Sequence, residues 1–154
     1  MRRRKQKGLT LIELIVAFTI MLILTAMAVP LARNKVRAEH ERELRYAVRE
    51  VRLSIDKFKD NCDLGYLGPQ KLGANCYPET LEQLVEGVKL PGPEGKKMRF
   101  LRHVPRDPFT GKTEWGLRSD QDDPDSTSWG GQDVFDIYTK TLQKAPDGTS
   151  YSEW

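Results

Sequence analysis

The feature that most constrains this chain is a long apolar run near its N-terminus. The run extends from Leu9 to Ala32 and follows a tail that carries five basic residues within the first seven positions. As a helix, 24 residues would be about 36 Å long, which is enough to span a hydrocarbon core of about 30 Å. We therefore predict a membrane-spanning helix over 9–32, with the basic tail on the cytoplasmic side.

One acidic residue, Glu13, interrupts this run. A carboxylate at the centre of a bilayer costs about 2.5–3.5 kcal/mol, so Glu13 needs a place near the end of the segment or a positively charged partner. Two simple interpretations of the run remain open. It could be a secretory signal peptide with a cleavage site at residues 25–28, or a plain membrane anchor. Neither gives a reason for Glu13.

The residues around Glu13 form a motif. Its members are Gly8, Thr10, Leu11, Glu13, Leu14 and, after the apolar run, Pro30. Together they resemble the N-terminal methylation motif of type IV pilins and type II secretion pseudopilins. The resemblance implies that residues 1–8 are a leader peptide, that a prepilin peptidase cuts between Gly8 and Leu9, and that the new amine of Leu9 is methylated. It also implies that Glu13 pairs with the amine of a neighbouring subunit during assembly. Leu9 departs from the phenylalanine that is usual in the motif.

A second periodic segment follows the apolar run. Residues 33–61 contain no glycine or proline, and apolar side chains recur at steps of four and three, at Leu44, Val48, Val51, Ile55 and Phe58. This spacing predicts an amphipathic helix with a narrow apolar stripe. A coiled coil is the alternative, but two heptads are short, so we expect the stripe to pack on the chain's own small domain.

Residues 62–154 are rich in turn-forming residues and predict a small globular domain. The pattern indicates a short helix over 77–85 and extended segments at 98–104, 113–117 and 134–141, with 151–154 closing the sheet. The predicted fold class is α+β: one long N-terminal helix packed on a small, three-stranded antiparallel sheet, as in pilin-like proteins.

Cys62 and Cys76 bracket a loop that is rich in glycine. Outside the cytoplasm, two such cysteines form a disulfide more often than they remain free thiols. In the chain-entropy picture, closing a loop of this length stabilises the fold by about 3 kcal/mol.

Several short motifs lie in the same half of the chain. They are Tyr77-Pro78, Asp107-Pro108-Phe109, Asp133-Val134-Phe135 and Asp147-Gly148. With the N-terminal motif, they resemble the major pseudopilins of type II secretion systems. The resemblance implies a structural subunit that polymerises into a helical filament with copies of itself. The implied partners are the prepilin peptidase, minor pseudopilins and an inner-membrane assembly platform. The implied location is the inner membrane, crossed once, with the C-terminal domain in the periplasm.

Residues 119–126, here called the acidic loop, contain four aspartates. Clusters of carboxylate oxygens bind hard cations, and Ca²⁺ takes six to eight such ligands. Major pseudopilins carry a calcium site in this region, so the resemblance implies structural Ca²⁺, with Asp122, Asp125 and Asp133 as the expected ligands. The spacing is not that of an EF-hand, and a solvated acidic loop is the alternative.

Composition narrows the function further. The formal charge is +3, but five of the 25 basic residues precede Gly8, so the remainder carries −2. We therefore expect no nucleic acid as a partner.

No nucleophile motif accompanies His103 and no glycine-rich phosphate loop is present in the sequence, so we expect that the protein is not an enzyme. The alternatives to a secretion pseudopilin are a type IV pilus or competence pilin, acting in adhesion, motility or DNA uptake, and a membrane-anchored periplasmic binding module.

Overall fold

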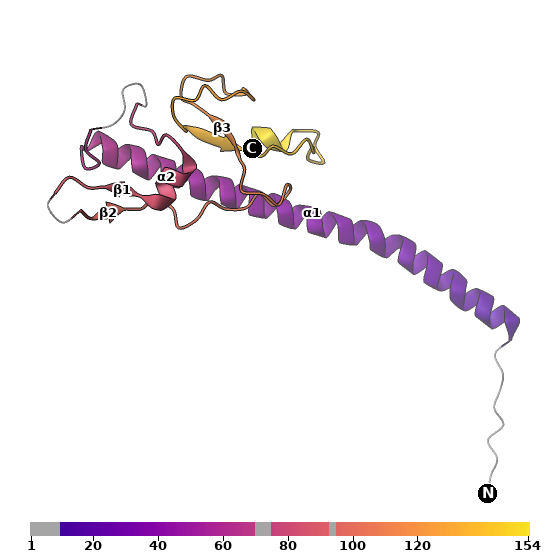
Figure 1. The fold of residues 1–154 in the computed structure, drawn as a ribbon. Helices are drawn as coiled ribbons and strands as arrows, with labels where there is room; N and C mark the ends of the chain where they lie inside the picture. Colours follow the sequence, from indigo (N-terminus) through magenta and orange to yellow (C-terminus); the bar gives the residue numbers. More distant parts are fainter. Residues whose placement is uncertain (1–9, 70–74, 93–94) are drawn as a thin grey trace, which may run out of the picture. The chain divides into compact units, whose positions relative to one another are not determined.

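The computed structural model describes residues 10–69, 75–92 and 95–154, without the side chains at positions 27, 28 and 31. The elements follow one another in the order α1, α2, β1, β2, β3, β4 and the 3₁₀ helix η1 (Figure 1). The chain divides into two compact units, Met1–Glu39 and His40–Trp154, and each is described by itself.

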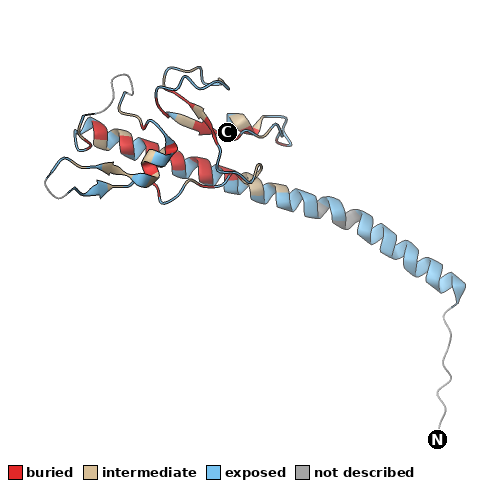
Figure 2. Ribbon diagram, viewed as in Figure 1, coloured by how far each residue is buried: buried red, intermediate tan, exposed pale blue. Residues whose placement is uncertain are grey.

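Helix α1 runs from Leu11 to Asp63 and includes Pro30. Its residues up to Glu39 belong to the first unit, where the described side chains are almost all exposed (Figure 2). Among the described residues, no helix combines the length and the apolar character needed to cross a membrane.

In the second unit, the predicted apolar stripe of α1 forms the centre of the core. Its members are no more than 5% exposed: Leu44, Val48, Val51, Ile55 and Phe58. Buried residues from the rest of the domain cover this stripe, among them Leu84, Trp115 and Ile137. Since a fully buried side chain of this size contributes about 1.5–3 kcal/mol, the stripe supplies much of the domain's stability. The prediction that 33–61 packs on the chain's own domain is confirmed for this part of α1.

Helix α2 spans Leu81–Glu86, four residues later at its start than the pattern predicts. Thr80 is the N-cap, and its hydroxyl accepts a hydrogen bond from the backbone N–H of Gln83 at 3.3 Å. A threonine cap satisfies one of the free N–H groups of the first turn, so the helix begins after Thr80 and not at Tyr77. The C-cap, Gly87, has a positive φ of 79° that favours glycine.

The strands form two separate two-stranded antiparallel sheets. Strand β1 (Val88–Lys89) pairs with β2 (Lys97–Met98), and β3 (Gly116–Arg118) pairs with β4 (Asp136–Tyr138). The α+β class and the long helix on a small antiparallel β region are confirmed, but the prediction of one three-stranded sheet is wrong. In the second pair, the Tyr138 ring lies against the Cα of Gly116, where any β-carbon would collide with it.

The C-terminal segment also differs from the prediction of a closing strand. Tyr151–Glu153 forms the 3₁₀ helix η1. The buried Tyr151 ring stacks on Phe109 with centroids 4.3 Å apart, and its hydroxyl donates a hydrogen bond to Glu41 Oε1 at 2.6 Å. A short helical turn places this large ring in the core and its hydroxyl on α1, so the end of the chain docks through side chains and not through a β-ladder.

Two polar connections hold the loops to this core. Arg52 of α1 donates hydrogen bonds to both carboxylate oxygens of Asp136 on β4, at 2.6 and 2.9 Å, and another to the backbone oxygen of Trp154 at 3.0 Å. Asp107 is fully buried and accepts hydrogen bonds from the Thr139 hydroxyl at 2.6 Å and the Phe109 N–H at 2.9 Å. Because a bidentate bond between arginine and a carboxylate is stronger than a neutral hydrogen bond, the Arg52–Asp136 contact fixes β4 on α1. Asp107 joins its own turn to Thr139, which follows β4.

Candidate functional site

The N-terminal turn of α1 is capped by Thr10, which contacts the backbone N–H of Glu13. Thr10 precedes the helix, its backbone oxygen accepts the N–H groups of Glu13 and Leu14 at 3.1 and 3.2 Å, and its hydroxyl lies 3.4 Å from the Glu13 nitrogen. Thr10 and Glu13 have the spacing of a capping box, a signal in the sequence that the methylation motif alone does not bring out. A carboxylate in the first turn also favours the positive end of the helix dipole. Gly8 and Leu9, the predicted cleavage and methylation positions, lie outside the described residues.

The helix beyond Glu13 presents an unusual surface. Large apolar side chains are more than half exposed on several sides of it, among them Leu11, Ile12, Phe18 and Leu22. Soluble monomers rarely expose contiguous apolar patches of more than a few hundred Å², and a helix that is apolar all round is normally buried. This helix therefore requires a covering environment that the described residues of the chain do not supply.

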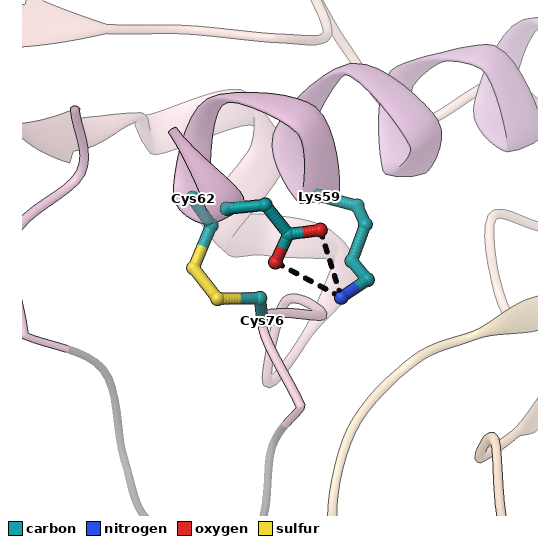
Figure 3. Close-up of a disulfide and its surroundings, with 4 residues drawn as sticks. Lys59, Cys62 and Cys76 are labelled. Atoms are coloured by element: carbon teal, nitrogen blue, oxygen red, sulfur yellow. Dashed lines mark hydrogen bonds and ion pairs between the residues drawn. A yellow bond between two sulfur atoms is a disulfide. The ribbon is translucent and has the colours of Figure 1, made fainter. Parts of the chain in front are cut away.

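Cys62 and Cys76 are joined by a disulfide, with their Cα atoms 5.6 Å apart. Figure 3 shows the bond linking the last turn of α1 to the segment that leads into α2, with Lys59 beside it. The Lys59 ammonium forms an ion pair with Asp63 at 3.0 Å and lies 5.2 Å from the centroid of the Tyr77 ring. The end of α1 is thus anchored to the domain by the disulfide and by the contact of the Lys59 ammonium with the Tyr77 ring.

In the acidic loop, Asp122 organises the backbone. Its Oδ2 accepts hydrogen bonds from the N–H groups of Ser119 and Gly130, at 2.8 and 3.1 Å. These two bonds lower the pKa of the Asp122 carboxyl. Asp122 therefore closes the loop, whereas Asp125 is exposed and no side-chain hydrogen bond or ion pair of it is seen in the described part of the chain.

Asp120 of the acidic loop lies next to Asp133, which follows the loop in the sequence. Asp133 is fully buried, and its Oδ1 accepts the backbone N–H of Asp120 at 3.2 Å. Asp120 Oδ2 accepts a hydrogen bond from Asn75 at 2.7 Å, which leaves Asp120 Oδ1 and Asp133 Oδ2 buried without a hydrogen-bond partner among the described residues. Burial, together with the neighbouring Asp120 carboxylate, raises the pKa of Asp133 from 3.8 to about 6.

These contacts separate the three expected calcium ligands. Within the described residues, no group of three or more His, Cys, Asp or Glu side chains is arranged to hold a metal ion. Asp122 is engaged with backbone amides and Asp125 is exposed. Asp133 is paired with Asp120, a residue outside the ligand set expected from the sequence. Two orphaned carboxylate oxygens are a partial fit to the oxygen-rich shell of Ca²⁺.

Comparisons with known proteins agree with the N-terminal motif. Residues 3–29 match the family described as "Prokaryotic N-terminal methylation motif". The chain is 30% identical over 118 residues to the type II secretion system core protein G of Klebsiella michiganensis, a match that covers 72% of this chain and 73% of that protein. No solved structure matches the chain.

The methylation motif at the head of α1, and the second half of α1 packed on small antiparallel sheets, define a pilin-like protein. The match to core protein G, at 30% identity and with nearly three quarters of both chains covered, makes the assignment more specific. The chain belongs to the family of type II secretion system core protein G, the major pseudopilins.

Proposed function

We propose that this chain is the structural subunit of a type II secretion pseudopilus, which polymerises through α1 to drive the export of folded proteins. The observation that carries the proposal is the surface of α1 in the first unit, where apolar side chains are exposed behind a single carboxylate, Glu13. Neighbouring copies of the same helix would bury that surface in a filament, and lipid would cover it before assembly. The kinship with core protein G supports this function over adhesion or motility.

The proposal includes processing and location. The motif match over residues 3–29 supports cleavage between Gly8 and Leu9 by a prepilin peptidase and methylation of the Leu9 amine. The subunit would wait in the inner membrane as a single-pass protein, held by residues 9–32 with its C-terminal domain in the periplasm. Minor pseudopilins and an inner-membrane assembly platform would be its further partners, and the role needs no catalytic residue.

In assembly, Glu13 would pair with the amine of a neighbouring subunit. Removing one partner of a buried ion pair costs about 3–5 kcal/mol, so a subunit that docks out of register leaves two charges uncompensated. The capping contact with Thr10 supports this role, because it orders the turn that carries the carboxylate.

We also propose a structural calcium ion, with a ligand set that differs from the sequence-based one. Asp133 and Asp120 are the better candidates, since each has a buried oxygen without a hydrogen-bond partner in the described part of the domain. Backbone carbonyls and water are the ligands that usually complete such a shell. Bound Ca²⁺ would offset the repulsion between the two carboxylates and stabilise the acidic loop.

The assembly role is tested with Glu13→Ala in the full chain, expressed with a prepilin peptidase and the secretion machinery. We expect leader cleavage, read by mass spectrometry of the N-terminus, to stay normal and filaments in sheared fractions to be lost. Glu39→Ala is the matched control, because Glu39 is an exposed acid of the same helix outside the motif. Normal filaments in the Glu13→Ala variant would refute the pairing.

A further inference from the structure

The uncovered face of α1 in the second unit carries a concentrated positive charge. Arg42, Arg45 and Arg49 lie three and four residues apart, with Tyr46 between them, and all four side chains are exposed. We call these four residues the basic ridge. The net charge of −2 for the chain after the tail conceals this patch, because the count averages over residues that the fold separates.

The basic ridge borders two shallow grooves, and one of its side chains, Arg45, is held in place by a ring contact. Its four residues line a shallow groove of about 220 Å³. An adjoining groove of about 280 Å³ shares Arg45 and Arg49 and also includes Leu53 and Trp154. The Arg45 guanidinium lies 4.1 Å from the centroid of the Trp154 ring, so its position is set before any partner arrives.

The counter-charges of the ridge are incomplete at one position, Arg49, whereas Arg45 lies close enough to Asp147 for its charge to act on that carboxylate. Like charges three or four residues apart on a helix repel one another, and among the described residues Arg49 has no ion-pair partner. Tyr46 and Leu53 are 73% and 51% exposed beside these charges. Arginine and tyrosine are residue types that are enriched in protein interfaces, so the composition of the ridge is that of a docking surface for an acidic partner.

The chain carries a complementary surface of its own in the acidic loop. Asp122 and Asp120 are engaged with Ser119, Gly130 and Asn75. Asp123 and Asp125 are exposed, and no side-chain hydrogen bond or ion pair of either is seen in the described residues. These two carboxylates flank Pro124, which limits the backbone freedom of the loop tip.

We infer that the basic ridge of one copy docks against Asp123 and Asp125 of a neighbouring copy, as a second contact in the filament. The inference rests on the proposed function, because an open helical filament needs a head-to-tail interface formed by two different, complementary surfaces. A basic helix face and a separate acidic loop on the same chain meet that requirement. Charge complementarity of this kind fixes orientation and rejects wrong arrangements.

Charge reversal and rescue test the docking in the full chain. Arg45→Glu with Arg49→Glu, and separately Asp123→Lys with Asp125→Lys, should each reduce sheared filaments by about tenfold or more, because like charges then face each other. Combining all four changes should restore filaments to within about threefold of wild type, since the attraction returns with inverted sign. Lys57→Glu and Glu114→Lys are matched controls at exposed positions outside both surfaces and should have no effect.

A crosslink guards against variants that simply fold poorly. Copies with Arg49→Cys, coexpressed with copies carrying Asp125→Cys, should give disulfide-linked dimers in filaments and none in the Glu13→Ala background. Full filament yield from either reversal, no rescue in the combination, or no crosslink would overturn the docking. Loss of binding to anionic lipid vesicles by Arg45→Glu/Arg49→Glu, without rescue, would identify lipid as the occupant and also overturn it. If the wild-type chain forms no filaments, the proposed function itself is refuted. If the wild type and the charge-reversal variants form filaments in equal amounts, only the docking is refuted.

Discussion

Replacing Asp133 by asparagine isolates the effect of the buried carboxylate pair. A pKa raised from 3.8 to about 6 corresponds to about 3 kcal/mol, at about 1.36 kcal/mol for each pKa unit. Because the folded state holds this proton more tightly than the unfolded chain, the stabilisation is complete below pH 3.8 and disappears as the pH rises through 6. The groups that face Asp133 are Asp120, Ser119 and Tyr77, with Lys59 over the Tyr77 ring.

The asparagine side chain in this variant would resemble the protonated acid. Its oxygen can accept the N–H of Asp120, and its amide can donate to the Asp120 oxygen that now has no partner in the described domain. At pH 7.5 without Ca²⁺, we therefore expect Asp133→Asn to increase the free energy of unfolding by up to about 3 kcal/mol. Between pH 4 and pH 6, the wild type should lose stability relative to the variant.

The assay is urea unfolding of the full chain in detergent, followed by tryptophan fluorescence, since Trp115 is buried in the core. Adding Ca²⁺ at pH 7.5 should stabilise the wild type and leave Asp133→Asn unchanged. Asp125→Asn is the matched control, and both its pH profile and its calcium response should match those of the wild type. Equal pH profiles for wild type and Asp133→Asn would refute the assignment of the raised pKa; no calcium response in the wild type would refute the metal site alone.

Two further predictions concern stability. Replacing Cys62 and Cys76 by serine should lower the free energy of unfolding by about 3 kcal/mol, measured as a lower urea midpoint. The reduced wild type is the control, because it lacks the same bond and should have the same midpoint as the serine variant. Asp107→Ala should cost about 2–4 kcal/mol, because it leaves the Phe109 N–H and the buried Thr139 hydroxyl without their acceptor. Thr139→Val should cost less, and a larger loss for Thr139→Val than for Asp107→Ala would contradict the view that Asp107 is the centre of this contact.

The helical parts of this protein were predictable because their signals are local. The methylation motif, the long helix and the buried stripe from Leu44 to Phe58 all follow from short-range patterns, and the structure confirms the helix and the stripe. The capping pair Thr10 and Glu13 was equally local.

The sheets were less predictable, because their strands are only two or three residues long. Alternation over so few residues does not separate one sheet from two. The same alternation did not distinguish a closing strand from the helical turn η1. That turn forms because it allows Tyr151 to pack on Phe109 and to bond with Glu41.

The sequence by itself therefore determined the class of this protein: a helix-led pilin-like subunit with a small α+β domain. Tertiary structure alone decided which charged residues meet. The contact of Arg52 with Asp136 joins residues 84 positions apart, and the contact of Asp133 with Asp120 joins residues 13 positions apart. Such contacts depend on how the loops close over the core, a property that no short-range period in the sequence encodes.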